Sequence, residues 1–328
     1  MKQLYAKIAI LIIAISSIGF ISCSQSKKEI KKEISTPKQK KQFFKLSLAQ
    51  WSLHKEIIEG RMSPLDFAQK AKELGFEGIE YVSQLYTNEL KNNPDSKVAM
   101  NTLLTTLKEK SKTYGVKNVL IMVDNEGDLA STVESERDKA VENHKKWVDA
   151  AQFLGCHSIR VNLFGTTNPE IWKQTATDGL SKLVDYAKDK NVNIIVENHG
   201  YLSSNAALLV EVINNVNAPN CGVLPDFGNF CLAREGGERW QAKCIEEYDR
   251  YKGVAEMMPV AKAVSAKSYD FDENGNELTI NYHKMLQIVK DADYTGYIGV
   301  EYEGSRLSEI DGIMATKNLL LKAAKQLN

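Results

Sequence analysis

The stretch KDKNVNIIVENH, residues 188–199, contains the pattern that decides the fold. A helix-type segment ends at Asn191, and a short apolar run follows that turns abruptly polar at Glu197. Asn tolerates the left-handed backbone conformation that the chain adopts just after a helix ends. The stretch therefore predicts a helix, a tight turn and a buried strand whose end carries polar groups.

The same unit recurs along the chain. It is found in KELGFEGIEYV (72–82), KTYGVKNVLIMV (112–123), FLGCHSIRVNLF (153–164) and DYTGYIGVEYE (293–303). The turn position is occupied there by Gly75, Gly115, Gly155 and Gly296. Because glycine adopts the left-handed conformation without steric cost, each unit is expected to re-aim the chain from a helix into a strand.

Three further strands are predicted, at 45–51, 221–227 and 259–267. Amphipathic segments alternate with the strands, for example at 63–74, 98–113, 135–154, 205–216, 281–292 and 308–327. Eight alternating β-α units predict an α/β fold, a (β/α)8 TIM barrel, over residues 46–328. A doubly wound open sheet is the alternative, but the segment LAQWSLHKE (48–56) lacks the glycine-rich phosphate turn usual after its first strand.

The N-terminus differs from the rest of the chain. Residues 1–45 carry ten Lys and two Glu, a net charge of +8, so the remaining residues carry −8. Lys2 and Lys7 form a positive region before an apolar run over 8–21, which is shorter than the roughly 20 residues of a spanning helix. Ser22-Cys23 then resembles the lipobox of bacterial lipoproteins. This pattern predicts a signal peptide at 1–22, with an uncleaved anchor as the alternative.

Acylated Cys23 and a basic, flexible tether, 23–45, would then hold the barrel to a membrane outside the cytoplasm, in the periplasm or at the cell surface. The tether either is a charged linker or lies along anionic lipid headgroups. The acidic body argues against nucleic acid as a partner. An oxidising compartment permits disulfides, but the pairing of Cys156, Cys221, Cys231 and Cys244 stays open, and buried free thiols fit equally well.

The carboxyl ends of the strands should form the active site, as they do in such barrels. Glu197, Asp226 and Glu301 end three predicted strands, and barrel closure would bring them together. Carboxylates gathered in this way need a cation, and oxygen ligands suit Mn²⁺, Mg²⁺ or another hard divalent ion. Asp226 has a simpler alternative role as a cap of the following helix.

Other side chains at the strand ends are candidates for substrate binding. They are Trp51, His54, Glu80, Arg160, His199 and Lys267. Structural roles are the alternatives: an ion pair of Glu80 with a lysine or with Arg160, a core position for Trp51, and a loop position for His199.

The segments FEGIEYV (76–82), IIVENHG (194–200), LPDFGNF (224–230), AKAVSAKSYDFDENGNE (261–277) and YIGVEYEG (297–304) resemble the sugar phosphate isomerase/epimerase group of the xylose-isomerase-like TIM barrels. The resemblance covers about 46–326. It implies a divalent metal of the Mn²⁺, Mg²⁺ or Co²⁺ class held by Glu197, Asp226 and Glu301. The family's strand-seven His is replaced by Ser265, so the fourth ligand is Ser265 or His199, or the metal is lost.

The resemblance further implies an isomerase or epimerase that moves a proton next to the carbonyl of a keto sugar or sugar derivative, through an enediolate. Glu197 and Glu301 would be the acid/base pair. The net negative charge of residues 46–328 argues against a phosphorylated substrate, which is itself negative. Two alternatives use the same residues: a lyase acting on a ketoglycoside and a non-catalytic sugar-binding lipoprotein. Related endonucleases need several His ligands, which this sequence does not supply at its strand ends. Substrate identity and oligomeric state stay open.

Overall fold

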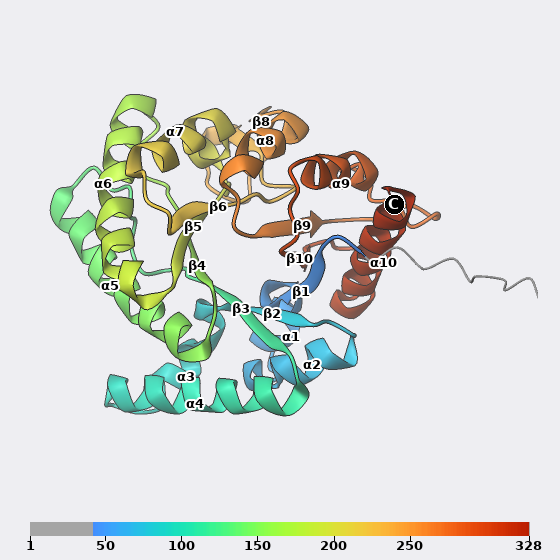
Figure 1. The fold of residues 1–328 in the computed structure, drawn as a ribbon, viewed down its shortest axis with the longest axis horizontal. Coiled ribbons are helices and arrows are strands. Elements are labelled where there is room, and N and C mark those ends of the chain that lie inside the picture. The colour runs from blue at the N-terminus through green and yellow to red at the C-terminus, as the bar shows by residue number, and fades with distance from the viewer. Residues whose placement is uncertain (1–41, 328) are drawn as a thin grey trace, which may run out of the picture. The chain divides into compact units, whose positions relative to one another are not determined.

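The computed structural model describes residues 42–327, so the predicted signal peptide, Cys23 and most of the predicted tether lie outside the described residues. Eight parallel strands form one sheet with helices around it (Figure 1). The strands are β1 (Lys45–Ala49), β2 (Gly78–Val82), β3 (Lys117–Met122), β4 (Ser158–Val161), β5 (Asn193–Glu197), β6 (Cys221–Leu224), β9 (Val264–Ser268) and β10 (Tyr297–Tyr302).

The sheet closes into a barrel. Its strand order is β6-β5-β4-β3-β2-β1-β10-β9, so the first and last strands of the barrel, β1 and β10, are neighbours. Parallel bridges join Val223 to Ala261 and Asp226 to Ser265, which links β6 to β9 across the remaining gap. The predicted (β/α)8 barrel is therefore confirmed.

The helices pack on the outside of the strands. They are α1 (His54–Ile58), α2 (Phe67–Glu73), α3 (Thr87–Lys91), α4 (Ser96–Tyr114), α5 (Glu134–Leu154), α6 (Pro169–Ala187), α7 (Ala206–Val216), α8 (Arg250–Met257), α9 (Tyr282–Asp291) and α10 (Glu309–Leu327). Several start at an Asp or Asn whose side chain accepts hydrogen bonds from the first free backbone N–H groups. These caps are Asp95, Asn168, Asn205, Asp249 and Asn281.

Two local predictions need correction. Gly75, Gly115, Gly155 and Asn191 have the expected left-handed conformation, but in the last unit Asp293, with φ of 54°, takes it instead of Gly296. Helix α9 ends at Asp291, so the left-handed residue lies two positions after the helix, and Gly296 belongs to the turn that leads into β10. Strand seven was expected at 259–267, but β9 begins only at Val264, since Met258–Val260 form a short 3-10 turn.

A second, two-stranded sheet interrupts the barrel after β6. Strands β7 (Cys231–Arg234) and β8 (Cys244–Glu247) form an antiparallel hairpin that the sequence pattern did not reveal. A disulfide between Cys231 and Cys244 joins them, whereas Cys156 and Cys221 are buried free thiols. The pairing left open by the sequence is thus assigned.

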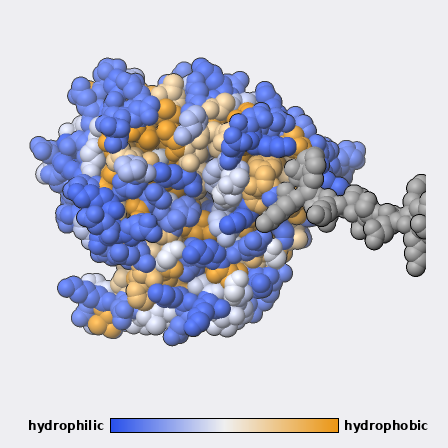
Figure 2. Space-filling view, viewed as in Figure 1, coloured by the Kyte–Doolittle hydropathy of each residue, from blue (hydrophilic) through white to orange (hydrophobic). Residues whose placement is uncertain are grey.

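In the view of Figure 2, hydrophilic residues cover most of the visible face, and hydrophobic residues show in smaller patches among them. This distribution is what amphipathic helices packed on a barrel produce. Within residues 42–327, no helix combines the length and the apolar character needed to cross a bilayer.

Candidate active site

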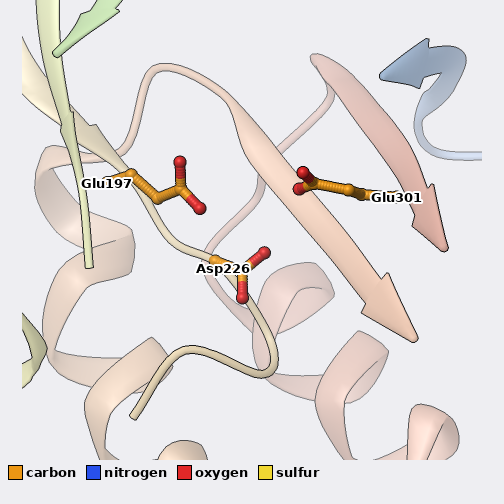
Figure 3. Close-up of side chains that lie close together, drawn as sticks. All are labelled: Glu197, Asp226 and Glu301. Carbon is orange, nitrogen blue, oxygen red and sulfur yellow. The ribbon is translucent and has the colours of Figure 1, made fainter. Parts of the chain in front are cut away.

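Three buried carboxylates meet at the carboxyl end of the barrel. Glu197 ends β5, Asp226 follows β6 by two residues, and Glu301 lies near the end of β10. One oxygen of each lies within 4.8 Å of the others, and the three side chains point toward one another (Figure 3). The structure thus brings together the three residues predicted as metal ligands.

The loop PDFGN fixes Asp226 in this cluster. The backbone N–H groups of Gly228 and Asn229 donate to Asp226 Oδ1, at 2.8 and 2.9 Å. The Asn198 side chain accepts from the Asp226 N–H at 2.7 Å and donates to its carbonyl at 3.1 Å. The carboxylate therefore organises its own loop, and the hairpin strand β7, not a helix, follows.

Ser265 lies between two members of the cluster. Its Oγ is 2.7 Å from Asp226 Oδ2 and 2.9 Å from Glu301 Oε2, because the bridge between β6 and β9 pairs Ser265 with Asp226. A hydroxyl has one proton to donate. Both contacts are satisfied together only if one carboxyl group is itself protonated.

Asp226 is suited to hold that proton. Burial, reinforced by the charges of Glu197 and Glu301, raises the pKa of Asp226 to about 8. Burial also raises the pKa values of Glu197 and Glu301, although Arg160 and Lys267 respectively act in the opposite direction. Without a bound cation, the cluster therefore reduces its like-charge repulsion by keeping a proton.

Two buried cations flank the cluster. Arg160 Nη1 lies 2.9 Å from Asp124 Oδ1, and Arg160 Nε lies 2.9 Å from Glu197 Oε2. The latter N–H is not aligned for a hydrogen bond, so that contact is chiefly electrostatic. Lys267 Nζ lies 3.0 Å from Glu303 Oε1 and 3.4 Å from Glu301 Oε1. The two cations thus contact four carboxylates, and Asp226 is a fifth close by, which leaves negative charge in surplus.

These donors fit a divalent cation. Three carboxylates and one hydroxyl offer only oxygen, the donor that Mg²⁺ and Mn²⁺ prefer. Burial and like charges raise the pKa of Asp226, and the carboxylates here outnumber the two buried cations. A bound cation would therefore lower the electrostatic repulsion within the cluster. Among the described residues, neither ring nitrogen of His199 belongs to this group of ligand atoms, and its Nδ1 is 2.8 Å from Asn162 Oδ1. Of the two predicted fourth ligands, Ser265 is the one placed beside the carboxylates.

A cavity of about 970 Å³ opens above the cluster. Residues that line it include Trp51, Asp124, Arg160, Asn162, Phe164, Glu197, His199, Trp240, Glu301 and Glu303. Trp51, Arg160 and His199 were predicted to bind substrate, and all three reach the cavity. Burial lowers the pKa of His199 to about 4, so its ring is neutral at physiological pH.

Two other predicted substrate-binding residues, His54 and Lys267, lie behind the side chains that line the cavity. His54 stacks on Trp51 with ring centroids 4.4 Å apart, and its Nδ1 is 3.3 Å from Glu309. Lys267 is buried beside Glu301 and Glu303. Among the described residues, neither is part of the cavity lining, and both instead position side chains that are.

Glu80 occupies a different place, inside the barrel. Ser47 Oγ donates to its Oε1 at 2.5 Å, and its Oε2 has no hydrogen-bond partner within the described part of the chain. The ion pairs with a lysine or with Arg160 that the sequence allowed are not formed in residues 42–327, where Arg160 instead pairs with Asp124 and Glu197. Burial raises the pKa of Glu80 to about 8.

Replacing Glu80 by Gln is expected to change the pH dependence of stability. The unfolded pKa is about 4.3, so between pH 4.3 and 8 only the folded chain holds the proton, and wild-type stability falls as pH rises. The amide has no such proton. The difference in unfolding free energy between Glu80→Gln and wild type should therefore rise by about 2 kcal/mol from pH 6 to 8.

Urea denaturation at several pH values measures this difference. Glu77→Gln, at an exposed position just before β2, is the matched control and should follow the wild-type profile. Parallel profiles for Glu80→Gln and wild type would show that Glu80 is ionised when folded.

Sequence reasoning missed part of the site. Asp124, Asn162 and Glu303 satisfy the same strand-end rule that selected Glu197, but no role in the site was predicted for them. Asn229, whose Nδ2 donates to Glu197 Oε1 at 3.0 Å, lies within the PDFGN motif. Trp240 had no comparable signal, because it belongs to the unpredicted hairpin.

Comparison with known proteins bears on the whole barrel. Residues 68–324 match the model of a family described as the xylose isomerase-like TIM barrel. The structure resembles a 3-keto-D-glucoside 4-epimerase from E. coli, with 13% identity, a TM-score of 0.63, and coverage of 85% of this chain and 99% of that one. It also resembles a xylose isomerase-like TIM barrel protein from Mycobacterium smegmatis in complex with magnesium, with 17% identity, a TM-score of 0.59, and coverage of 87% and 98%.

A short stretch matches a curated sequence. It is 39% identical over 57 residues to the 3'-dehydrocarminate deglycosidase alpha subunit of a Microbacterium species. The match spans 17% of this chain and 16% of that relative.

Proposed function

Because the chain belongs to the xylose isomerase-like TIM barrel family, we propose that it is a divalent-metal-dependent isomerase or epimerase acting on a keto sugar or sugar derivative. The observation that carries this proposal is the pair Glu197 and Glu301. Both line the cavity, and each has a carboxylate oxygen within 4.8 Å of one of Asp226, where the two could hold a cation together. They come from β5 and β10, on different sides of the barrel.

Glu197 and Glu301 are proposed to move the proton. One carboxylate removes a proton from the carbon next to the carbonyl, and the other carboxyl group returns a proton to the product. Burial raises the pKa of each, which brings both closer to the range where a carboxylate is a useful base and its acid a useful donor. Their positions on different strands favour access to opposite faces of a bound sugar.

The neighbouring residues would orient these groups. Asn229 donates to Glu197, and Lys267 and Ser265 contact Glu301, so each carboxylate has few alternative positions. A divalent ion held by Glu197, Asp226, Glu301 and Ser265 would act as a Lewis acid toward the substrate carbonyl. Arg160 and His199 on the cavity wall would bind hydroxyl groups, and Trp51 would pack on the sugar ring.

A lyase is the second candidate. The same proton abstraction expels a leaving group when one is attached at the β carbon, so no further residue is needed. The short match to a deglycosidase subunit favours this alternative. A non-catalytic sugar-binding protein is the third possibility left by the sequence.

Solvent deuterium exchange distinguishes the three. The full-length protein, supplied with Mn²⁺ or Mg²⁺, is incubated in deuterated water with a panel of keto sugars and of methyl glycosides whose sugar ring keeps a free keto group, followed by NMR. We expect an epimer or isomer that carries deuterium next to the carbonyl, and the signal should vanish after chelation with EDTA. Release of methanol would identify the lyase, and binding without exchange would contradict both enzymatic proposals.

We also propose that the chain is a lipoprotein, anchored through Cys23 outside the cytoplasm, with residues 1–22 removed and 23–45 serving as the tether. The Cys231–Cys244 disulfide supports this location, because such bonds persist in oxidising compartments.

A further inference from the structure

The hairpin that follows β6 is held firmly beside the cavity. Its strands are joined by the Cys231–Cys244 disulfide. The Tyr201 hydroxyl lies within hydrogen-bond distance of two carbonyl oxygens near the hairpin tip, those of Gly237 (3.1 Å) and Glu238. Tyr201 itself has a left-handed backbone, with φ of 54°, in the loop after β5. The hairpin tip is thus tied to the loop that carries His199.

These restraints place an aromatic surface in the cavity wall. The Trp240 ring centroid lies 4.8 Å from that of His199 and 5.5 Å from that of Phe164, nearly perpendicular to Phe164. The Arg239 guanidinium lies over the Phe164 ring at 4.3 Å. Trp240 remains 48% exposed although it has these neighbours. A large aromatic side chain that is fixed yet exposed inside a cavity is suited to stack on a ligand.

This surface is connected to the candidate reaction centre. His199, which contacts Trp240, is hydrogen-bonded through Nδ1 to Asn162, and Asn162 Nδ2 donates to Asp124 at 2.7 Å. Asp124 is the partner of Arg160, which faces Glu197. The aromatic surface and the carboxylate cluster therefore line the same cavity with polar side chains between them.

The cavity is large for one monosaccharide. Its volume of about 970 Å³ is near the upper end of the range of about 300–1,000 Å³ found for sites that hold drug-sized ligands. His199, Asn162, Asp124 and Arg160 contact one another in turn between Trp240 and Glu197, so a sugar ring placed at Glu197 and Glu301 leaves Trp240 available to a further group of the ligand.

We infer that Trp240, Phe164 and Arg239 form a subsite for a second ring, so that the substrate is a glycoside rather than a free monosaccharide. The second ring presents a flat face to Trp240, while the guanidinium of Arg239 can donate to its polar edge. This inference rests on the proposed function only for the position of the reacting sugar.

Calorimetric titration of the full-length protein tests the subsite without requiring turnover. The probes are matched methyl and phenyl glycosides of common pyranoses, together with disaccharides that replace the phenyl group by a sugar ring. We expect the phenyl glycoside or the disaccharide to bind about tenfold more tightly than the methyl glycoside in at least one series. Preference for phenyl indicates an aryl aglycone, and preference for the disaccharide indicates a sugar.

Two substitutions on the hairpin provide the contrast. Trp240→Ala should remove the preference for the second ring, whereas Ile245→Ala, a 61%-exposed position on β8 outside the described cavity lining, should preserve it. Equal affinities within every series, or a preference that survives in Trp240→Ala, would overturn the inference.

The two proposals fail in different ways. Deuterium exchange into keto sugars without any preference for a second ring would leave the proposed function intact and refute the subsite. Tighter binding of the second ring that depends on Trp240, without deuterium exchange into keto sugars, would support the subsite and refute the proposed function.

Discussion

Replacing Glu197 by Gln is expected to lower carbon-bound hydrogen exchange about 10²–10⁴-fold and to weaken divalent metal binding at the same time. The substitution keeps the size of the side chain but removes a base and a charged ligand. It also leaves Arg160 with Asp124 as its remaining anionic partner among the described side chains. Elemental analysis of the dialysed protein and deuterium exchange by NMR measure the two effects.

Asp226→Asn separates the two proposed roles of the cluster, metal binding and proton transfer. Asp226 is a proposed ligand but not a proposed acid or base, so excess metal should restore more activity to this variant than to Glu197→Gln. Glu211→Gln, an exposed position on α7 that pairs with Lys173, is the control and should behave as wild type. Undiminished exchange in Glu197→Gln would remove Glu197 from the proposed mechanism.

Lys267→Met is expected to reduce the free energy of unfolding by about 3–5 kcal/mol, because it leaves buried carboxylates without their cation. Lys267 is 1% exposed, and its Nζ contacts Glu301 and Glu303. Although burial disfavours a charged ammonium group, the surrounding carboxylates raise the pKa of Lys267, so it stays charged. Urea denaturation in the presence of EDTA measures the loss.

The control for this variant is Lys182→Met. Lys182 also contacts two carboxylates, Asp138 and Asp178, but its side chain is 36% exposed, so the cost should stay below about 1 kcal/mol. In addition, Mn²⁺ should raise the melting temperature of Lys267→Met more than that of wild type, because the cluster has become more negative. Similar losses in the two variants would mean that Lys267 does not neutralise the cluster.

The sequence indicated part of the site because strand ends can be recognised locally. Glu197 and Glu301 follow apolar runs that change abruptly to polar residues, and the barrel places such ends at one face. Asp124 and Asn162 satisfied the same rule, but only their contacts with Arg160 and His199 distinguish them from solvent-facing residues. The roles of His54 and Glu80 could not be assigned in this way, because side-chain direction depends on packing.

The sequence by itself determined the eight strands, their alternation with helices and the chemical types gathered at the strand ends. These follow from hydrophobic periodicity and from turn residues such as Gly155 and Asn191, which act over a few neighbouring positions. Only the tertiary structure decided that Ser265 bridges Asp226 and Glu301 and that the hairpin brings Trp240 against His199. Those contacts arise when the barrel closes and the disulfide forms. Both events bring together residues that are distant in the sequence, so no local sequence pattern reveals the contacts.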